Sequence, residues 1–335
     1  MTLTSTRRRA AAAAAAATLA VAVLALSSPA AALAGPGQRD AAGSASPCGR
    51  VSAPPAYRHV IIIMDENHSY RDIIGSRNAP YINSLARRCG LARDYHNITH
   101  DSLPNYLAIT SGLPYQRLLR FDHDCLPSSC QTPAANLFSQ AGSWREYAGS
   151  MPSNCDKSDS GHYAPKHNPA VYYTGLPGCR ADDVPLGTPG GSALLSDFGR
   201  ERTAPAVAYV TGNLCDDMHG APGCGRGRVA RGDAWLSRWL PRITSTPVYR
   251  DGHTVIFLVW DEGTGGRAGE RCYRNTSDPS CHVPAIVIAP SVRPGTVVPA
   301  RFDHYSLLET AEILLGLPRL GRAASAASMK AGFNL

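Results

Sequence analysis

Two apolar runs of the chain each end on side chains that carry oxygen. Residues 60–67 read Val-Ile-Ile-Ile-Met-Asp-Glu-Asn, and residues 255–262 read Val-Ile-Phe-Leu-Val-Trp-Asp-Glu. Unbroken apolar runs of this length are typical of buried parallel strands, and open α/β folds bind their ligands at the carboxyl ends of such strands. If the two strand ends lie side by side, they form an oxygen-rich site for a divalent cation. The expected ligands are Glu66, Asn67, Asp261 and Glu262.

Oxygen ligands of this kind suit Mg²⁺, Ca²⁺ or Mn²⁺, and carboxylates also bind Zn²⁺. Acidic residues are common in loops, so either pair alone would more often mark a strand that exits into solvent. Two similar pairs favour a metal site. The glycines at 263, 265 and 266 favour it too, because they let the backbone approach closely after the second pair.

A serine lies where a helix is expected to begin. The pattern of residues 102–111 predicts a helix that stops at Gly112, which places Ser102 at its N-terminus. The free backbone N–H groups and the helix dipole at such a position favour a phosphate oxygen and an ionised serine. Ser102 is therefore a candidate nucleophile. Its more common use at this position would be as an ordinary N-cap.

Three histidines lie near the ends of predicted strands or helices. His219 follows a strand that is expected to begin near Ala206, His282 directly precedes another strand, and His304 starts a helix. Each could bind phosphate oxygens or transfer a proton near neutral pH, and each could equally be a structural hydrogen-bonding residue. Five other histidines are expected in surface or loop positions: His59, His123, His162, His167 and His253.

The remaining pattern predicts strands that alternate with helices. The expected strands cover 59–64, 206–211, 254–260 and 284–290, and the expected helices cover 79–88, 102–111, 229–243 and 305–315. This alternation predicts a mostly parallel sheet with helices on both faces. Residues 113–200, rich in Pro, Gly, Ser and Cys, are expected to form a loop-rich, disulfide-pinned excursion that caps the pocket and shapes substrate choice.

Several catalytic fingerprints do not occur in the chain. The motifs GxGxxG, GxxxxGKS/T, GxSxG and HExxH are missing, which argues against Rossmann, P-loop, α/β-hydrolase and zincin folds. The residues that remain favour metal-assisted attack at phosphorus.

The amino-terminal residues have the composition of an export signal. Arginines at 7–9 precede an apolar, alanine-rich run to Leu26 and the small-residue sequence Ala-Leu-Ala at 32–34. We therefore expect a signal peptide over 1–34, a flexible leader over 35–50 and a single catalytic domain over 51–335. The adjacent arginines also permit the twin-arginine route. The protein is expected to be secreted, with no transmembrane segment in the mature chain.

The charge of the chain is modest. It is +7, and it falls to +4 without the three arginines of the predicted signal, because residues 1–34 hold no acidic residue. No long basic run accompanies this excess, so nucleic acid is not an expected partner.

Ten cysteines follow the predicted cleavage site. An even number in an exported chain indicates disulfides, and no CxxC pair supports the competing structural zinc site. Sequence proximity favours three local pairs, Cys125–Cys130, Cys215–Cys224 and Cys272–Cys281, and leaves the pairing of the other four cysteines open.

Several short motifs together resemble a known family. They occupy 64–70, 79–83, 102–108, 213–219, 260–263, 282–284 and 303–308, so that they span roughly residues 57–320 in order. The series resembles the bacterial phosphoesterase family, which contains acid phosphatases and non-specific phospholipases C and belongs to the alkaline phosphatase superfamily. The resemblance implies a three-layer, alkaline-phosphatase-like α/β core.

The resemblance also implies roles for individual residues. Ser102 would be the nucleophile beside one divalent metal ion held by the four strand-end ligands, and His219 would stabilise the phosphoryl oxygens. In the mechanism that we expect, a nearby histidine such as His219 is also the base that activates water on the phosphoserine. Phosphate-binding roles would fall to Asn105, His282 and His304. Many members of the superfamily use a histidine-rich site with two zinc ions, whereas this chain offers mainly oxygen ligands, so the identity of the metal stays open.

The expected function is that of a secreted, metal-dependent phosphoesterase that hydrolyses small phosphate monoesters through a phosphoserine intermediate. One alternative is a phosphodiesterase or phospholipase C that acts on lipid headgroups with the same site. An alternative of another class is a non-enzymatic extracellular binding protein whose acidic loops bind structural calcium.

Overall fold

The computed structural model of the chain describes residues 46–275 and 277–335. The signal peptide predicted over 1–34 and most of the leader predicted over 35–50 lie outside these residues. The end of that leader is anchored to the domain, which a flexible segment would not be. Cys48 is buried and disulfide-bonded to Cys89, and the backbone N–H of Arg50 donates to Pro290 O at 2.7 Å.

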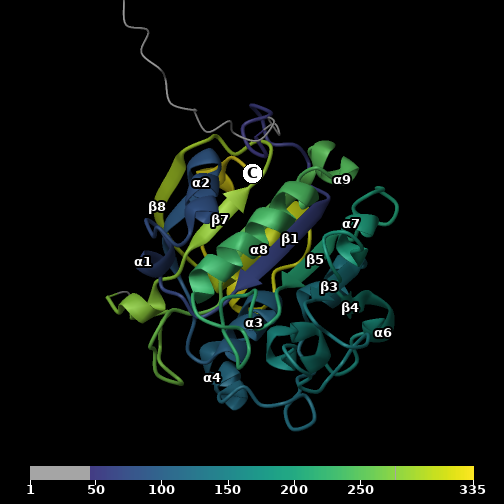
Figure 1. Cartoon of the computed structure of the whole chain (residues 1–335), viewed down its shortest axis with the longest axis vertical. Helices are drawn as coiled ribbons and strands as arrows, with labels where there is room; N and C mark the ends of the chain where they lie inside the picture. The colour runs from purple at the N-terminus through teal and green to yellow at the C-terminus, as the bar shows by residue number, and fades with distance from the viewer. Residues whose placement is uncertain (1–45, 276) are drawn as a thin grey trace, which may run out of the picture. The chain divides into compact units, whose positions relative to one another are not determined.

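One sheet of eight strands runs through the described residues, in the order β4-β3-β5-β1-β6-β7-β2-β8 (Figure 1). The strands are β1 (His59–Asp65), β2 (Gly90–His96), β3 (Trp144–Ala148), β4 (Asp183–Pro185), β5 (Val207–Thr211), β6 (Thr254–Trp260), β7 (Ala285–Ile288) and β8 (Thr296–Asp303). All neighbouring pairs are parallel except those that β7 makes with β6 and β2. The predicted α/β class with a mostly parallel sheet is confirmed.

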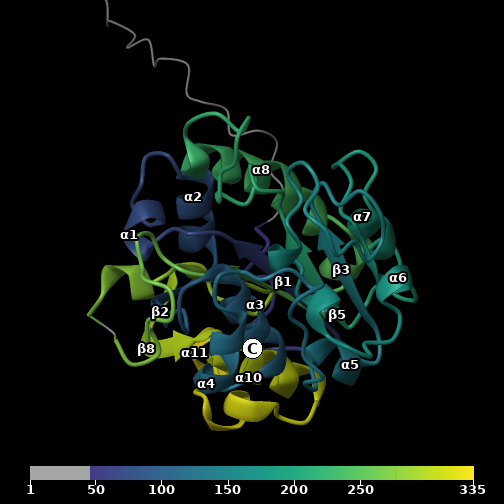
Figure 2. The same ribbon diagram turned by 90° about the horizontal axis from the view of Figure 1, so that it is seen from below.

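Helices cover both faces of this sheet. Figure 2 shows α2 and α8 on one side, and α3, α5 and α10 on the other. The helices are α1 (Tyr70–Ile73), α2 (Pro80–Arg88), α3 (Ser102–Ser111), α4 (Tyr115–Leu118), α5 (Leu137–Ala141), α6 (Cys179–Asp182), α7 (Ala193–Asp197), α8 (Arg228–Ile243), α9 (Pro247–Arg250), α10 (His304–Leu315) and α11 (Lys330–Phe333). Within the described residues, no helix has the length and apolar character needed to cross a membrane.

The two central strands explain why the strongest sequence signals were right. Every residue of β1 and β6 is buried, because helices cover both faces of the sheet. A strand in this position excludes water from both of its sides, so its sequence is a continuous apolar run rather than an alternating one. The two strands pair in parallel from His59↔Thr254 to Asp65↔Trp260, so their carboxyl ends finish side by side.

Four strands were not predicted from the sequence: β2, β3, β4 and β8. Two of them, β3 and β4, lie within residues 113–200 and extend the sheet beyond β5, so this segment contributes to the core as well as to loops. The missed strands are short or carry charged residues, as in Trp-Arg-Glu-Tyr-Ala of β3, and the residues of β8 alternate irregularly between buried and exposed. Sequence periodicity is weak in such strands because they are short or interrupted by charged residues.

Five disulfides link all the cysteines. The three predicted local pairs, Cys125–Cys130, Cys215–Cys224 and Cys272–Cys281, are confirmed. The other two join Cys48 to Cys89 and Cys155 to Cys179, across 41 and 24 residues. Spacing could not identify these two, because the fold brings their partners together over longer stretches of chain.

Candidate active site

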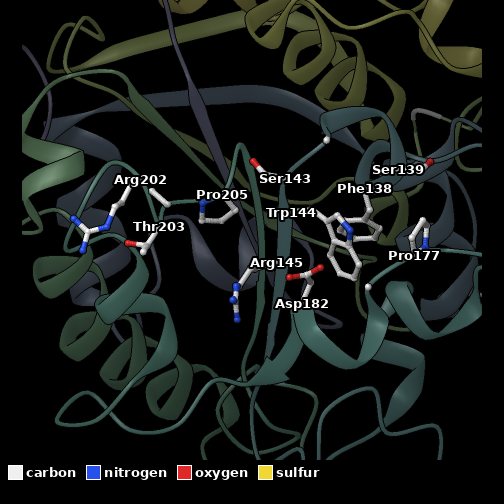
Figure 3. Close-up of a pocket in the computed structure, with 13 residues that line it drawn as sticks. Phe138, Ser139, Ser143, Trp144, Arg145, Pro177, Asp182, Arg202, Thr203 and Pro205 are labelled. Carbon is white, nitrogen blue, oxygen red and sulfur yellow. The ribbon is translucent and has the colours of Figure 1, made fainter.

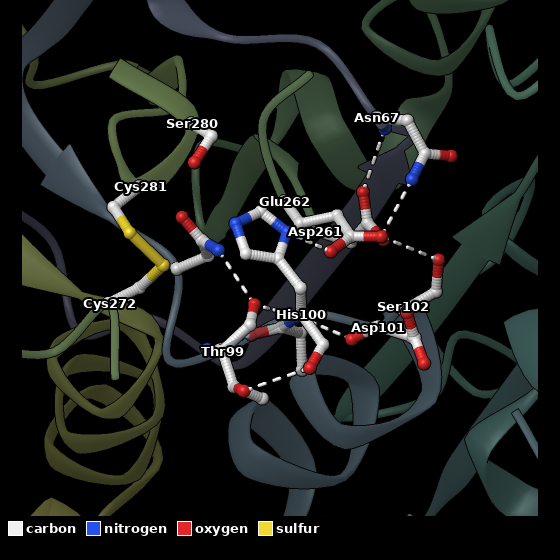
Figure 4. Close-up of polar contacts among 12 residues, drawn as sticks. Asn67, Thr99, His100, Asp101, Ser102, Asp261, Glu262, Cys272, Ser280 and Cys281 are labelled. Atoms are coloured by element: carbon white, nitrogen blue, oxygen red, sulfur yellow. Dashed lines mark hydrogen bonds and ion pairs between the residues drawn. A yellow bond between two sulfur atoms is a disulfide. The ribbon is translucent and has the colours of Figure 1, made fainter. Parts of the chain in front are cut away.

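The ends of β1 and β6 bring the two acidic pairs into one cluster. The backbone N–H of Asn67 donates to Asp261 Oδ1 at 2.9 Å, and its side-chain amide donates to Glu262 Oε1 at 2.7 Å (Figure 4). Glu66 directly follows β1 and is fully buried. Asn67, Asp261 and Glu262 therefore contact one another at the carboxyl edge of the sheet, and Glu66 directly precedes Asn67 in the chain.

Ser102 contacts this cluster from helix α3, which lies in the same helix layer as α5 and α10. It is the first residue of α3, and its Oγ donates to Glu66 Oε2 at 3.0 Å and to Glu262 Oε1 at 3.4 Å. The N-cap position belongs to Asp101, one residue earlier than the sequence indicated, and the hydroxyl of Ser102 does not cap the helix. An ordinary capping serine would point its oxygen at the helix N–H groups. This hydroxyl faces carboxylates instead.

The negative charge of the cluster is poorly compensated by the protein. Glu66, Asp261 and Glu262 are all buried, and Asp261 Oδ2 has no hydrogen-bond partner. Burial, and then the nearby charges of Glu66 and Glu262, raise the pKa of Asp261 well above its usual range. A divalent cation would neutralise the buried negative charge and give Asp261 Oδ2 a partner. A donor set of carboxylate and amide oxygens fits Mg²⁺, Ca²⁺ or Mn²⁺. The residues present therefore fit a hard metal ion.

A histidine that was expected in a surface loop lies inside the site. His167 is buried, with Nε2 at 3.2 Å from Glu66 Oε1 and Nδ1 at 3.0 Å from Asp217 Oδ2. Burial lowers its pKa, but Glu66 and Asp217 more than offset this effect and raise it to about 9. His167 is therefore a cation at neutral pH, held between two carboxylates. The surface prediction was also wrong for His59, which is buried and bonds Pro205 O at 2.8 Å.

Charge from His167 and its neighbours keeps Glu66 ionised. Although burial raises its pKa, the charge and hydrogen bond of His167, together with the charge of Lys166, lower the pKa of Glu66 to about 2. The metal-ligating atoms of Glu66, His167 and His219 lie within 4.8 Å of one another, so the predicted His219 does belong to the site. Burial, with the charges of His167 and Lys166, lowers the pKa of His219.

Lys166 and Asp124 complete the polar wall beside His219. Lys166 Nζ lies 2.7 Å from Asp124 Oδ2 and 3.2 Å from His219 Nε2. The other oxygen of Asp124 accepts from the backbone N–H of Leu103 at 2.9 Å, in the first turn of α3. Neither Lys166 nor Asp124 has a signal in the sequence, because both lie in irregular segments between 113 and 200.

Two further residues that the sequence analysis did not select contact the acidic cluster. Tyr106 Oη donates to Glu66, and His100 Nδ1 bonds Glu262. Tyr106 lies one helical turn after Ser102 on α3, so the i, i+4 spacing was a usable signal. Gly266 packs directly on the His100 ring, where any Cβ would collide with it. This contact explains one of the glycines that follow the second acidic pair.

Three residues expected to bind phosphate have other partners in the structure. Asn105 accepts from the backbone N–H groups of Ile98 and Thr99 and donates to Thr99 O and Asp101 O, so it shapes the loop before Ser102. Because its amide is fully used, no group is left for a phosphate. We therefore revise its role to loop positioning.

The two other histidines proposed for phosphate binding are revised in the same way. His304 Nε2 donates to Asp261 O at 2.7 Å and Nδ1 accepts from Tyr95 at 3.1 Å, while burial lowers its pKa to about 4. His304 is therefore a neutral residue whose hydrogen bond to the backbone of Asp261 fixes the carboxyl end of β6. His282 Nε2 donates to Arg93 O at 2.9 Å, and its ring stacks on Tyr70.

A separate hollow lies at the opposite ends of the strands. It has a volume of about 440 Å³ and is lined by Trp144, Arg145, Asp182 and Arg202, near the amino ends of β3 and β5 (Figure 3). Arg145 is already paired with Asp197, at 3.4 Å. Ligands of open α/β folds bind at the carboxyl ends, so the acidic cluster and not this hollow is the candidate active site.

Comparison with known proteins identifies similar chains. A family model described as the phosphoesterase family matches residues 76–318, which include Ser102, His167, His219 and the second acidic pair. The phosphatidylinositol-3-phosphatase of Mycobacterium tuberculosis is 29% identical over 282 residues, which are 82% of each chain. The acid phosphatase of Aspergillus fumigatus is 24% identical over 281 residues, which are 80% of this chain and 57% of that protein.

Solved structures share the fold at low sequence identity. A protein of the alkaline phosphatase superfamily from Vibrio parahaemolyticus aligns with a TM-score of 0.55 at 12% identity, over 85% of this chain and 74% of that one. The phosphonate monoester hydrolase of Agrobacterium radiobacter aligns with a TM-score of 0.54 at 15% identity, over 83% and 77%. These two likenesses show that the chain shares the fold of these structures.

Proposed function

Given that this chain belongs to the phosphoesterase family and is a hydrolase of phosphate esters, we propose that it cleaves monoesters through a phosphoserine formed on Ser102. Its cofactor is one divalent ion at the carboxyl edge of the sheet, with the ligands Glu66, Asn67, Asp261 and Glu262. A hydrolase of this family replaces the alternative of a non-enzymatic calcium-binding protein.

One observation carries the proposal. The hydroxyl of Ser102 lies 3.0 Å from Glu66 and 3.4 Å from Glu262, although these residues come from three separate parts of the chain. A buried serine surrounded by carboxylates is an unfavourable arrangement for stability alone, because the carboxylates repel one another. It suits a nucleophile that shares a cation with them.

The residues of the chain provide the other elements of the reaction. When bound, the ion would lower the pKa of the Ser102 hydroxyl and neutralise charge on the phosphoryl group. Ser102 gives up its hydroxyl proton to solvent and its Oγ attacks phosphorus. The bond between phosphorus and the ester oxygen breaks, the ester oxygen leaves with a proton from solvent, and the phosphoryl group stays on the serine. The N-terminus of α3, where Ser102 lies, and Lys166, which is linked to that helix turn through Asp124, offer positive charge to the phosphoryl oxygens.

His219 is suited to activate the water that hydrolyses the phosphoserine. Its Nδ1 donates to Gly220 O at 2.9 Å, so Nε2 carries the lone pair, and in the free enzyme this nitrogen accepts from Lys166 Nζ at 3.2 Å. Its lowered pKa keeps the imidazole neutral, as a general base requires. Water attack then releases inorganic phosphate and returns the hydroxyl of Ser102.

Monoesters are favoured over diesters by the similarity to the mycobacterial phosphatase. The mycobacterial relative, which is matched over 82% of its length, is named as a phosphatase of a phosphoinositide, which is a monoester on a lipid headgroup. The assay compares release of phosphate from an aryl monoester with release of the alcohol from the matching diester. A higher kcat/KM for the diester would reject the monoester assignment in favour of the phosphodiesterase.

Export is proposed on the basis of cysteine chemistry. All five disulfides fall between Cys48 and Cys281, and such bonds persist in oxidising compartments. Fusion of residues 1–34 to a reporter enzyme that works only outside the cytoplasm tests this. The reporter is expected to be active with these residues and inactive without them.

The central test replaces the nucleophile. Ser102→Ala is expected to reduce kcat by about 10³-fold or more, because it removes the attacking atom, while the fold is kept. Ser111→Ala is the matched control, since Ser111 is a buried serine on the same helix whose hydroxyl donates to Leu107 O at 2.6 Å and accepts from the backbone N–H of Leu113 at 3.3 Å. Mass spectrometry of acid-quenched wild type should find phosphate on Ser102. Wild-type turnover by Ser102→Ala would end the assignment.

A further inference from the structure

An acidic side chain occupies the place where a phosphoryl group is expected to bind. Asp124 Oδ1 accepts from the backbone N–H of Leu103 at 2.9 Å, and its Oδ2 accepts from Lys166 Nζ at 2.7 Å. Leu103 directly follows the nucleophile, and Lys166 also lies 3.2 Å from His219 Nε2. The carboxylate therefore uses a helix N-terminal N–H group and a lysine, the two kinds of donor that bind phosphate oxygens.

The backbone around Asp124 is held in a conformation that brings the side chain to this place. Both His123 and Asp124 have left-handed backbone angles, with φ of 65° and 50°, which residues other than glycine adopt at a cost. The loop is fastened on both sides. The N–H of His123 donates to Asp101 Oδ2 at 2.8 Å, and the Cys125–Cys130 disulfide follows directly.

The pair is accessible enough to be rearranged. The side chains of Asp124 and Lys166 are 18% and 21% exposed, whereas Ser102 and Glu66 are buried. Asp124 therefore lies on the solvent side of the nucleophile, where a phosphate ester must enter. A dianionic phosphoryl group is a stronger partner for Lys166 than one carboxylate, so it can take over both donors once it binds.

We propose that Asp124 is a built-in competitor of phosphate, which holds Lys166 and the first turn of α3 in the free enzyme and returns to them as the product leaves. It thereby weakens the binding of inorganic phosphate and speeds its release. Asp124 is thus a positioning residue that acts through Lys166. The inference rests on the proposed function, because it assigns the phosphoryl position to the space beside Ser102.

The test is the variant Asp124→Asn. An asparagine can still accept from the Leu103 N–H through its side-chain oxygen, but it no longer carries the charge that holds Lys166. Inorganic phosphate is expected to inhibit the variant at an about tenfold lower concentration, the scale of one partly buried charge pair. KM for an aryl phosphate is expected to fall with it, while kcat does not rise.

A second readout does not depend on turnover. Inorganic phosphate should raise the melting temperature of Asp124→Asn at a lower concentration than it does for wild type, with the same divalent metal present in both. Asp122→Asn is the matched control, because Asp122 lies on the same loop and contacts neither Lys166 nor the helix N-terminus. It should leave the phosphate inhibition constant and the melting curve unchanged.

A double-mutant cycle separates competition from a general effect on the loop. In a Lys166→Met background, the gain in phosphate affinity from Asp124→Asn should shrink, because the partner that it releases is gone. If Asp124→Asn folds poorly, Lys166→Met alone still gives a measurement. It should weaken the binding of inorganic phosphate in the thermal assay.

Two outcomes would overturn the inference. One is an unchanged or higher phosphate inhibition constant for a folded Asp124→Asn. The other is an undiminished gain in the Lys166→Met background. Both are distinct from failure of the proposed function, which would appear as turnover by Ser102→Ala or as the lack of phosphoserine in wild type.

Discussion

A buried carboxyl group away from the acidic cluster allows a quantitative test of the structure. Asp183 begins β4 and is fully buried, and the side-chain amide of Asn168 donates to both of its carboxylate oxygens at 3.0 Å. Glu146 lies opposite it on β3, and the charge of Asp156 adds to the effect of burial and raises the pKa of Asp183. Asn168 directly follows His167, so this contact supports the turn that delivers a histidine to the active site.

The size and sign of the effect follow from the pKa of Asp183. Burial raises it from 3.8 to about 7, so the folded state binds a proton more tightly than the unfolded chain does. Protonation of Asp183 stabilises the folded state fully below pH 3.8, and this stabilisation is lost as the pH rises towards 7. The difference corresponds to about 4 kcal/mol of unfolding free energy. Above pH 7 Asp183 adds no further change.

Asp183→Asn removes this titration and keeps the shape of the side chain. Asn168 Oδ1 has no partner in the structure, so a flipped Asn168 amide can accept from the new side-chain amide. Between pH 4 and pH 8 the unfolding free energy of the variant should therefore gain up to about 4 kcal/mol relative to that of wild type. The two proteins should differ by no more than about 1 kcal/mol at pH 4.

Urea unfolding with the disulfides intact measures this difference. Both proteins are unfolded at several pH values between 4 and 8, in the same metal concentration, so that the contribution of the ion and of other buried acids cancels in the comparison. A difference that stays constant within about 1 kcal/mol over this range would show that Asp183 is not buried as the structure places it.

Two further perturbations concern the active site. Removal of divalent ions should abolish turnover and lower the melting temperature, because Glu66, Asp261 and Glu262 then repel one another. Restoring a single kind of metal ion should recover both turnover and melting temperature. Full activity in protein with no detectable metal would contradict the metal site. Tyr106→Phe removes a hydrogen bond to the ionised Glu66 and should lower kcat/KM by roughly 10- to 100-fold, the equivalent of about 1.5–3 kcal/mol. An unchanged kcat/KM would refute this role of Tyr106.

The parts of the fold that could be predicted from the sequence are those with a strong local signal. The apolar runs that became β1 and β6 are buried on both faces, and helices α3 and α10 end at glycines with left-handed angles, Gly112 and Gly316. By contrast, β8 is only partly buried and carries a proline, so its sequence does not resemble that of a core strand.

The residues of the candidate site also divide into those that the sequence predicts and those that it does not. Glu66, Asn67, Asp261 and Glu262 were predictable because they end two recognisable strands, and the parallel register then brings them together. His167 was not predictable. It lies in a short turn without sequence periodicity. Its burial depends on contacts with Glu66, about a hundred positions away just after β1, and with Asp217, fifty positions away after β5.

By itself, the amino-acid sequence determined the kinds of groups available, since oxygen ligands follow two buried strands and a serine begins a helix. Only the tertiary structure decided which groups meet. It turned the hydroxyl of Ser102 toward carboxylates rather than toward its own helix, used both nitrogens of His304 to hold a strand end, and placed Asp124 on Lys166. The physical reason is that charge and hydrogen bonding act over a few ångströms in space, whereas the order of strands in the sheet sets which distant residues come that close.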